Sequence, residues 1–312
     1  MGRFIVRRVI SLIGVLIAIT ILVFALFQFL PHPELQLAGR FASPATLAHI
    51  RHQWGFDRPI YIRYVDTMKL IFTGKVISYD QQLNVDHELV QRLPATISLA
   101  VGAGIIWLST GILFGLISAW RAGRWSDRAL TVLSMIGVSM PVFFLGASLS
   151  YYIGDKLQFL PASDYVSIGS NPWEWLKHMI MPWFALSVLF IGVYSRVLRS
   201  TILDTINDDY VRTARAKGLS ERQVMIRHVL RNSMIPIVSL FGLDFASVIG
   251  GGAILTESVF NLQGAGQFAA TSVQQLDIPP VMVITIFGAS AVVIIGALVD
   301  VVYAMLDPRI RL

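Results

Sequence analysis

The apolar runs of this sequence hold few side chains that could do chemistry, and Asp244 is the clearest of them. A carboxylate near the middle of an apolar run costs about 2.5 to 3.5 kcal/mol when it is exposed to lipid, so Asp244 should face protein or water. It could line a polar path, hydrogen-bond to a neighbouring helix or relay protons. Because the other runs offer it no evident acidic or basic partner, we favour a path or a hydrogen bond. Another run breaks at Pro141, just after Ser139, which suits either a channel wall or a simple kink.

The usual motifs of catalysis, metal binding and nucleotide binding give no site. His49 and His52 lie three residues apart without a carboxylate pattern beside them, so we interpret them as solvated rather than as metal ligands. The chain has no cysteines, which excludes disulfides and cysteine metal sites. The pair Gly74-Lys75 is followed by Val76 and does not complete a phosphate-binding loop. We therefore predict no catalytic residue, metal or cofactor on this chain, and any energy source must lie on a partner.

A strongly basic stretch between two apolar runs, residues 204–236, carries the clearest local signals. Asn207 can cap a first short helix, and Gly218 suits the left-handed position that ends it. Ser220 opens a capping box for a second helix, which we expect to run to about Asn232. The pattern predicts two short helices joined at an elbow. By charge and periodicity alone, this elbow fits a docking surface for a protein and a basic loop on anionic lipid equally well.

The elements that position these residues are membrane helices. The chain has 312 residues, is 55% hydrophobic and only 14% charged, and its mean hydropathy is +0.66, which leaves too little polar surface for a soluble globule. We predict an all-α membrane protein with six spans, each near the 20 residues that a crossing needs. The predicted spans are Val9–Leu30, Ala95–Trp120, Ala129–Ile153, Met179–Ser195, Ser233–Thr256 and Val281–Leu306.

The net charge of +6 follows from this topology rather than from nucleic-acid binding. Lys and Arg gather at both chain ends and in the 121–128 and 196–231 loops, so we expect these loops and both termini to be cytoplasmic. We interpret the first span as a retained membrane anchor, because its apolar run is too long for a signal peptide. The predicted organisation is an N-terminal tip and first span (1–30), a small extracytoplasmic cap (31–94) and a five-span core (95–312) that contains the elbow (204–232).

Several stretches of the sequence resemble one family of transporters. They are TARAKGL at 213–219, RHVLRN at 227–232, WGFDRPIYIRY at 54–64, RLPAT at 92–96 and LVDVVYAMLDPRIRL at 298–312. Together they resemble permease subunits of ABC importers, in particular the dipeptide and oligopeptide branch. The segment TESVFNLQGAGQ at 256–267 resembles the same family, with Leu262 and Gln263 in place of a more usual Trp-Pro. Residues 212–214 replace the Glu-Ala-Ala of other importer branches, and residues 32–34 replace a Gly-Asp-Pro turn.

The resemblance implies that the elbow is a coupling helix in a cleft of an ATPase subunit. The residues it assigns to that contact are Tyr210, Thr213, Ala214, Arg215, Ala216, Lys217, Gly218, Leu219 and Ser220. Glu257 joins Ser139, Pro141 and Asp244 as candidates for the transport path.

The implied partners are a second permease, two ATP-binding subunits that hold ATP and magnesium, an extracytoplasmic substrate-binding protein, a peptide and membrane lipid. The implied location is the bacterial inner membrane. A nickel or other small-solute importer shares these loop motifs, and an autonomous secondary transporter or channel remains as the alternative from another class.

Overall fold

The computed structural model describes residues 2–28, 43–53 and 55–306 of the chain. Within those ranges the regular elements are helices, apart from one isolated antiparallel bridge between Ile77 and Asn84. This confirms the predicted all-α fold class. The helices are α1 (Gly2–Gln28), α3 (Pro44–Gln53), α4 (Ile60–Phe72), α5 (Val85–Trp120), α6 (Trp125–Ser139), α7 (Val142–Leu149), α8 (Pro172–Thr205), α9 (Asp209–Ala216), α10 (Glu221–Gln223), α11 (Arg231–Ser247), α12 (Ile254–Val259), α13 (Ala265–Gln274) and α14 (Ile278–Leu306), with π-helical turns at Ser150–Lys156, Val224–Leu230 and Val248–Gly252.

Five helices in the described ranges are long and apolar enough to cross a membrane. These candidate spans are Val9–Phe27, Val85–Trp120, Pro172–Thr205, Glu221–Gly252 and Ile278–Val299. The chain is therefore a multi-pass membrane protein.

The predicted third span, residues 129–153, does not form one continuous helix. The helices α6 and α7 meet at an angle of 94°, and the count reaches six only when this bent pair is taken as one span. The bend falls where Met140 and Pro141 are extended. Proline lacks a backbone N–H and disfavours a helical residue before it, so the helix stops there. The break predicted at Pro141 is confirmed, and it is a sharp turn of 94° rather than a gentle kink.

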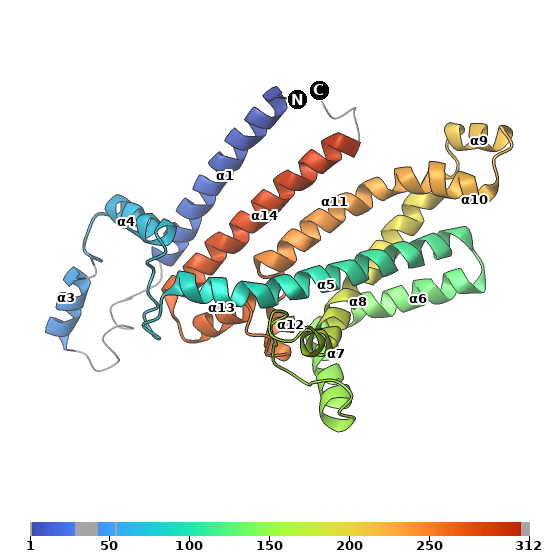
Figure 1. Ribbon diagram of the computed structural model, residues 1–312. Coiled ribbons are helices and arrows are strands. Elements are labelled where there is room, and N and C mark those ends of the chain that lie inside the picture. Colours follow the sequence, from blue (N-terminus) through green and yellow to red (C-terminus); the bar gives the residue numbers. More distant parts are fainter. Residues whose placement is uncertain (1, 29–42, 54, 307–312) are drawn as a thin grey trace.

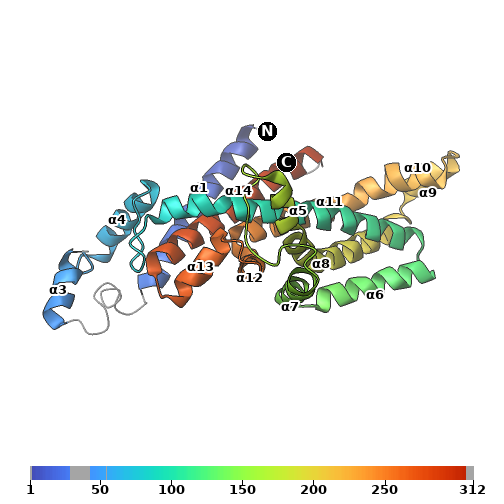
Figure 2. The same cartoon turned by 60° about the horizontal axis from the view of Figure 1, so that its bottom comes forward.

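The helices α5 and α8 form the most extensive helix pair, and α6 and α11 pack against α8, whereas α1 packs against α14 (Figures 1 and 2). Two glycines of α5 make this closeness possible. A Cβ atom on Gly111 would lie 2.7 Å from the Cβ of Tyr194, and one on Gly115 would lie 2.8 Å from the carbonyl oxygen of Ser195. The small-residue face predicted from their four-residue spacing is thus a helix crossing.

The predicted fifth span, residues 233–256, ends earlier than expected. Its helix stops at the glycine triplet, where Gly251 has a φ of 121°, and Thr256 already belongs to α12. A positive φ is readily adopted by glycine, so the triplet can turn the chain out of the span. Gly250 also packs backbone to backbone against Gly288 of α14, because a Cβ on Gly250 would lie 2.9 Å from the carbonyl oxygen of Gly288.

The described part of the cap consists of α3, α4 and the 73–84 loop. The helix predicted after Pro59 is α4, with Pro59 at its N-terminal cap position. The next helix, α5, begins at Val85 and runs through Pro94, so it starts before the predicted boundary at residue 95. Asp277 holds the cap loop to the core: it accepts hydrogen bonds from the Ser78 hydroxyl and, at 2.9 Å, from the backbone N–H of Tyr79.

The described ends of the chain and the elbow lie on one side of the molecule. In Figure 1 the start of α1 and the end of α14 are at the top, and α9 and α10 are at the upper right, far from α3 and α4. This arrangement agrees with the predicted grouping of the termini and the elbow. The predictions made for residues 32–34 and for the final residues 307–312 lie outside the described ranges.

Candidate functional site

The elbow, residues 204–232, contains the two helices and the joint that the sequence predicts. Gly218 has a φ of 78° just after α9 ends, as the left-handed position requires. Ser220 accepts a hydrogen bond from the N–H of Gln223, whose side chain reaches back to the N–H of Ser220, so the predicted capping box is present. The joint is therefore specified by its own residues.

Two details of the elbow differ from the sequence predictions. Asn207 does not cap α9: the cap position is Asp208, and the Asn207 amide instead donates to the carbonyl of Leu203 at the end of α8. The second helix does not end near Asn232 either. It passes through a π-helical segment directly into α11, so one continuous helix extends from Glu221 to Gly252. The helix continues although Asn232 is a weak helix former and Pro236 lies inside it, so the burial of Ser233 and Ile237 overrides the local preference.

Side chains of α9 pack against this continuous helix and hold α9 in place. Val211 and Ala214 are buried in the same apolar cluster as Val224 and Val229. The Asn232 amide donates to the Tyr210 hydroxyl at 2.9 Å. A helix of eight residues is too short to be stable alone, so these contacts must hold it in place.

The opposite face of α9 is exposed. Of the predicted contact residues, Ala214 faces inward and Arg215 is half-buried, where its guanidinium bonds Glu221 at 3.0 Å. The remaining seven are exposed: Tyr210, Thr213, Ala216, Lys217, Gly218, Leu219 and Ser220. Arg212 is exposed as well, beside the exposed Asp208 and Asp209, so the free face of α9 is polar and carries charges of both signs. Arg222, Arg227 and Arg231 are exposed on the helix that follows.

The structure contains a buried ion pair near the elbow that we did not predict from the sequence. Arg199 of α8 donates two hydrogen bonds to Asp127 of α6, at 2.7 and 2.8 Å. Asp127 also accepts from the Ser118 hydroxyl and from the N–H of Gly123, so it ties α5, α6 and α8 together. An arginine on an otherwise apolar stretch of helix needs an acidic partner. The position of Arg199 on such a stretch was the signal in the sequence that could have predicted this ion pair.

The membrane carboxylate Asp244 has one partner that the sequence did not reveal. The Tyr194 hydroxyl of α8 donates to Asp244 of α11 at 2.8 Å. Tyr194 is fully buried beside the indole of Trp107, whereas Asp244 is half-buried. This is the interhelical hydrogen bond that we predicted as one of the two favoured roles, and it leaves part of the carboxylate accessible.

The other path candidates have different surroundings. Ser139 and Pro141 are exposed at the bend between α6 and α7. Glu257 is fully buried and accepts from the Thr96 hydroxyl at 2.7 Å and from the N–H of Gln267 at 2.8 Å. Within the described ranges these candidates share no hydrogen-bond partner with Asp244.

The glycine turn after α12 packs closely against the carboxylate of Glu257. A Cβ atom on Gly264 would lie 2.5 Å from the Glu257 carboxylate, and one on Gly266 would lie 3.0 Å from it. The N–H of Ala265, between them, donates to the Thr96 hydroxyl at 2.9 Å. We define Thr96, Glu257, Ala265 and Gln267 as the Glu257 cluster, which joins α5, α12 and α13.

No group of three or more His, Cys, Asp or Glu side chains in the described ranges is arranged to hold a metal ion. A multi-pass helical protein with a short, exposed helix packed between two of its spans has the form of a membrane transport component.

Comparison with known families identifies the class further. The family described as binding-protein-dependent transport system inner membrane component matches residues 111–312, and the N-terminal family of the same membrane components matches residues 1–100. The chain belongs to this family of binding-protein-dependent transport system membrane components.

Individual relatives match over nearly the whole chain. A "probable peptide ABC transporter permease protein" of Sinorhizobium fredii is 36% identical, with all of both chains covered. The glutathione transport system permease GsiC of Salmonella choleraesuis is 33% identical over 100% of this chain and 99% of its own. The dipeptide transport system permease DppB of Alkalihalophilus pseudofirmus is 31% identical over 98% of each.

A solved structure shares the fold. A chain of the inward-facing MetNI methionine ABC transporter aligns with a TM-score of 0.54, covering 70% of this chain and 96% of its own, at 14% sequence identity. The similarity at this identity supports a common arrangement of helices.

Proposed function

We propose that this chain is a permease subunit of an ATP-driven importer for dipeptides or oligopeptides in the bacterial inner membrane. The observation that carries the proposal is the form of α9. It is held in place by its buried residues Val211 and Ala214 and presents an exposed polar face at the junction of α8 and α11. The peptide class is supported by the names of the full-length relatives.

The assembly that this function needs contains three further kinds of component. A second permease completes the path, two ATP-binding subunits hold ATP and magnesium, and an extracytoplasmic binding protein delivers the peptide. The exposed charges of α9 and the arginines of the helix after it would suit a polar cleft of complementary charge on an ATP-binding subunit. The autonomous carrier considered from the sequence is set aside, because the family works with a binding protein.

The coupling step follows from the continuity of the helix that begins at Glu221. When ATP binding draws the ATP-binding subunits together, they displace α9. The contacts of α9 with Val229 and Asn232 carry that displacement into α11, which holds Asp244 and ends at the Gly251 turn. A ligand shifts such an equilibrium only through different contacts in the two states, and α9 is where ATP binding would create them.

The path candidates divide into two roles. Ser139, Pro141 and the accessible part of Asp244 are polar or broken positions on membrane helices and are assigned to the path surface. Glu257 is assigned instead to holding the outer ends of α5, α12 and α13 together, because its carboxylate is enclosed by its own partners.

Transport is tested with the complex reconstituted in vesicles, using a labelled dipeptide, ATP and the binding protein. ATP-dependent uptake that excess unlabelled dipeptide abolishes supports the proposal. Uptake of nickel, with none of dipeptide, would transfer the chain to the small-solute alternative.

The proposed orientation places both termini and the elbow in the cytoplasm. The native chain has no cysteines, so single-cysteine variants report topology without background. In intact cells a membrane-impermeant maleimide should label Lys69→Cys on α4 and leave Lys217→Cys unlabelled until the cells are permeabilised. The reverse pattern would overturn the orientation.

A further inference from the structure

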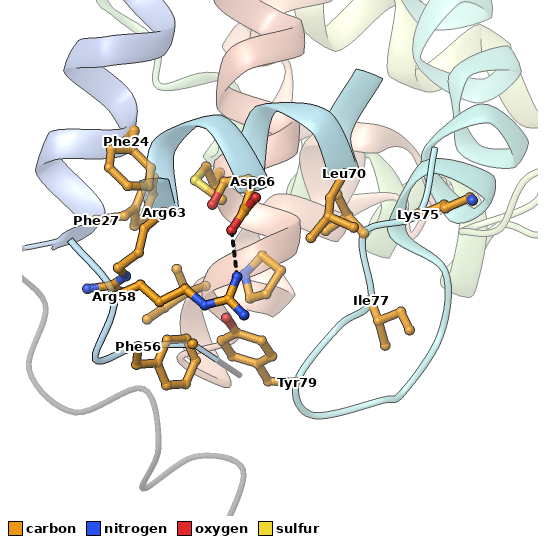
Figure 3. A pocket seen from close by; sticks show the side chains of 16 residues that line it. Phe24, Phe27, Phe56, Arg58, Arg63, Asp66, Leu70, Lys75, Ile77 and Tyr79 are labelled. Atoms are coloured by element: carbon orange, nitrogen blue, oxygen red, sulfur yellow. Dashed lines mark hydrogen bonds and ion pairs between the residues drawn. The ribbon is translucent and has the colours of Figure 1, made fainter. Parts of the chain in front are cut away.

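A pocket of about 290 Å³ lies where the cap meets α1 and α14, away from the elbow and from Asp244 (Figure 3). Its apolar lining comes from the ends of two membrane helices. Phe24 and Phe27 lie at the end of the Val9–Phe27 span, and Ile278 and Met282 lie at the start of the Ile278–Val299 span. The apolar part of the pocket is therefore at the boundary of the hydrocarbon region.

The polar edge of the pocket belongs to the cap. Arg58 and Arg63 line this edge beside Phe56 and Tyr79, as Figure 3 shows. Arg58 pairs with Asp66 at 3.1 Å, while Arg63 lies over the ring of Phe56 at 5.5 Å. In the described part of the chain no carboxylate is within ion-pair distance of Arg63.

The charge at this edge is positive. The pocket is lined by three basic side chains, Arg58, Arg63 and Lys75, and by one carboxylate, Asp66. Burial raises the pKa of Tyr79 to about 12, so its phenol is neutral at neutral pH. Guanidinium groups bind phosphate oxygens in pairs of parallel hydrogen bonds. A ligand that fits both parts of the pocket must carry an anionic group next to an apolar chain.

We propose that this pocket binds the headgroup of an anionic phospholipid, with the phosphate at Arg63 and Arg58 and the first part of an acyl chain against Phe27 and Met282. The position at the end of two spans favours a membrane lipid over a soluble anion. The cavity has room for the headgroup and the start of a chain, while the rest of the lipid stays in the bilayer.

Such a lipid would strengthen a joint that has few polar contacts. At this point α1 meets the cap through a hydrogen bond of 2.8 Å between the hydroxyls of Thr20 and Tyr64 and through an edge contact between Phe24 and Tyr64. The lipid would add contacts between α1, α4 and α14 at once. This inference does not depend on which solute the complex transports.

The test measures binding of short-chain lipids to the complex purified in a neutral detergent. Dioctanoyl phosphatidylglycerol should bind at least tenfold more tightly than dioctanoyl phosphatidylcholine. Arg63→Gln should weaken phosphatidylglycerol binding about fivefold and the double change Arg58→Gln with Arg63→Gln about thirtyfold, because each basic residue near an anionic lipid surface contributes about fivefold. Lys69→Gln is the matched control, because Lys69 lies on α4 outside the pocket. This variant should bind phosphatidylglycerol as tightly as the wild type does.

A second variant separates the lipid from a free anion. Leu70→Trp places bulk in the pocket without changing its charge, so it should weaken phosphatidylglycerol and leave weak binding of glycerol 3-phosphate unchanged. Three results would overturn the proposal: equal affinity for the two lipids, glycerol 3-phosphate as tight as phosphatidylglycerol, or an equal loss in the Lys69 and Arg63 variants. Retention of the partner subunits during purification shows that each variant is folded.

Discussion

The elbow and the Glu257 cluster are both built around short helices and turns, but they are held in opposite ways. The elbow takes its shape from partners close in sequence, such as Ser220 with Gln223 and Arg215 with Glu221, and it exposes a polar face. The Glu257 cluster joins residues 161 and 169 positions apart and buries its carboxylate completely.

The difference indicates what each region can do. Locally determined structure keeps its shape when a partner displaces it, so the elbow can move as a unit. Buried polar groups with distant partners fix their elements together, because opening them leaves donors and acceptors unsatisfied. We therefore assign motion to the elbow and anchoring to the Glu257 cluster, and the following variants test that division.

The largest effect on stability is expected from Glu257→Ala. It leaves the Gln267 N–H and the Thr96 hydroxyl without their acceptor and opens a cavity beside two glycines, which should cost about 3 kcal/mol. The check is thermal unfolding of the purified complex. Glu257→Gln keeps the shape and one acceptor and should lose clearly less. Equal melting of Glu257→Ala and wild type would remove the anchoring role.

Gly218→Val should affect coupling more than folding. A side chain at Gly218 has open space, so the cost is the strain of a β-branched residue at positive φ, about 2 kcal/mol, confined to the joint. Membrane insertion should persist, while peptide uptake per ATP hydrolysed falls about tenfold or more.

The control at the same position is Gly218→Asn, because asparagine tolerates the left-handed region. It should keep most of the coupling. Normal uptake by Gly218→Val would count against the elbow as the moving element.

Tyr210→Phe should have a small effect on both properties. It removes the acceptor for the Asn232 amide at an exposed site, which corresponds to about 0.5 to 1 kcal/mol. Since this bond links α9 to α11, a modest loss of coupling should accompany it, measured as uptake at fixed ATPase rate. A loss as large as that of Gly218→Val would place the main link at Tyr210 rather than at the joint.

The smallest effect is expected from Glu221→Gln. The pair with Arg215 is exposed, and such pairs contribute about 0 to 1 kcal/mol. Stability and uptake should both stay near wild-type values in the assays above. A large loss in either would mean that the elbow depends on a charge pair rather than on its caps and buried residues.

The sequence predicted features whose partners are close in sequence, as in the elbow, better than features whose partners are distant, as in the Glu257 cluster. Gly218, Ser220 and the helix after Pro59 were found because their signals lie within a few residues of the structure they determine. Hydropathy located the long helices because a span is one continuous apolar run. The end of the second elbow helix was misplaced because Asn232 and Pro236 are local stop signals, and the packing of buried residues such as Ile237 overrides them.

The missed features are pairs that only the fold brings together. Nothing near Asp244 in the sequence points to Tyr194, 50 residues earlier, and nothing near Asp127 points to Arg199, 72 residues later. Glu257 was assigned to the path by its family segment, whereas its burial depends on Thr96 in another helix. The angle of 94° at Pro141 likewise depends on how α6 and α7 pack, not only on the proline.

The most direct test of the account is photo-crosslinking from the exposed face of α9 in the native complex. A photoreactive amino acid at Ala216, an exposed residue of α9, should attach this chain to an ATP-binding subunit, and the yield should change when ATP is added. The same group at Leu70, on the cap, should give no such product. A product with the ATP-binding subunit from Leu70, or none from any exposed position of α9, would contradict the assignment of the elbow as the coupling contact.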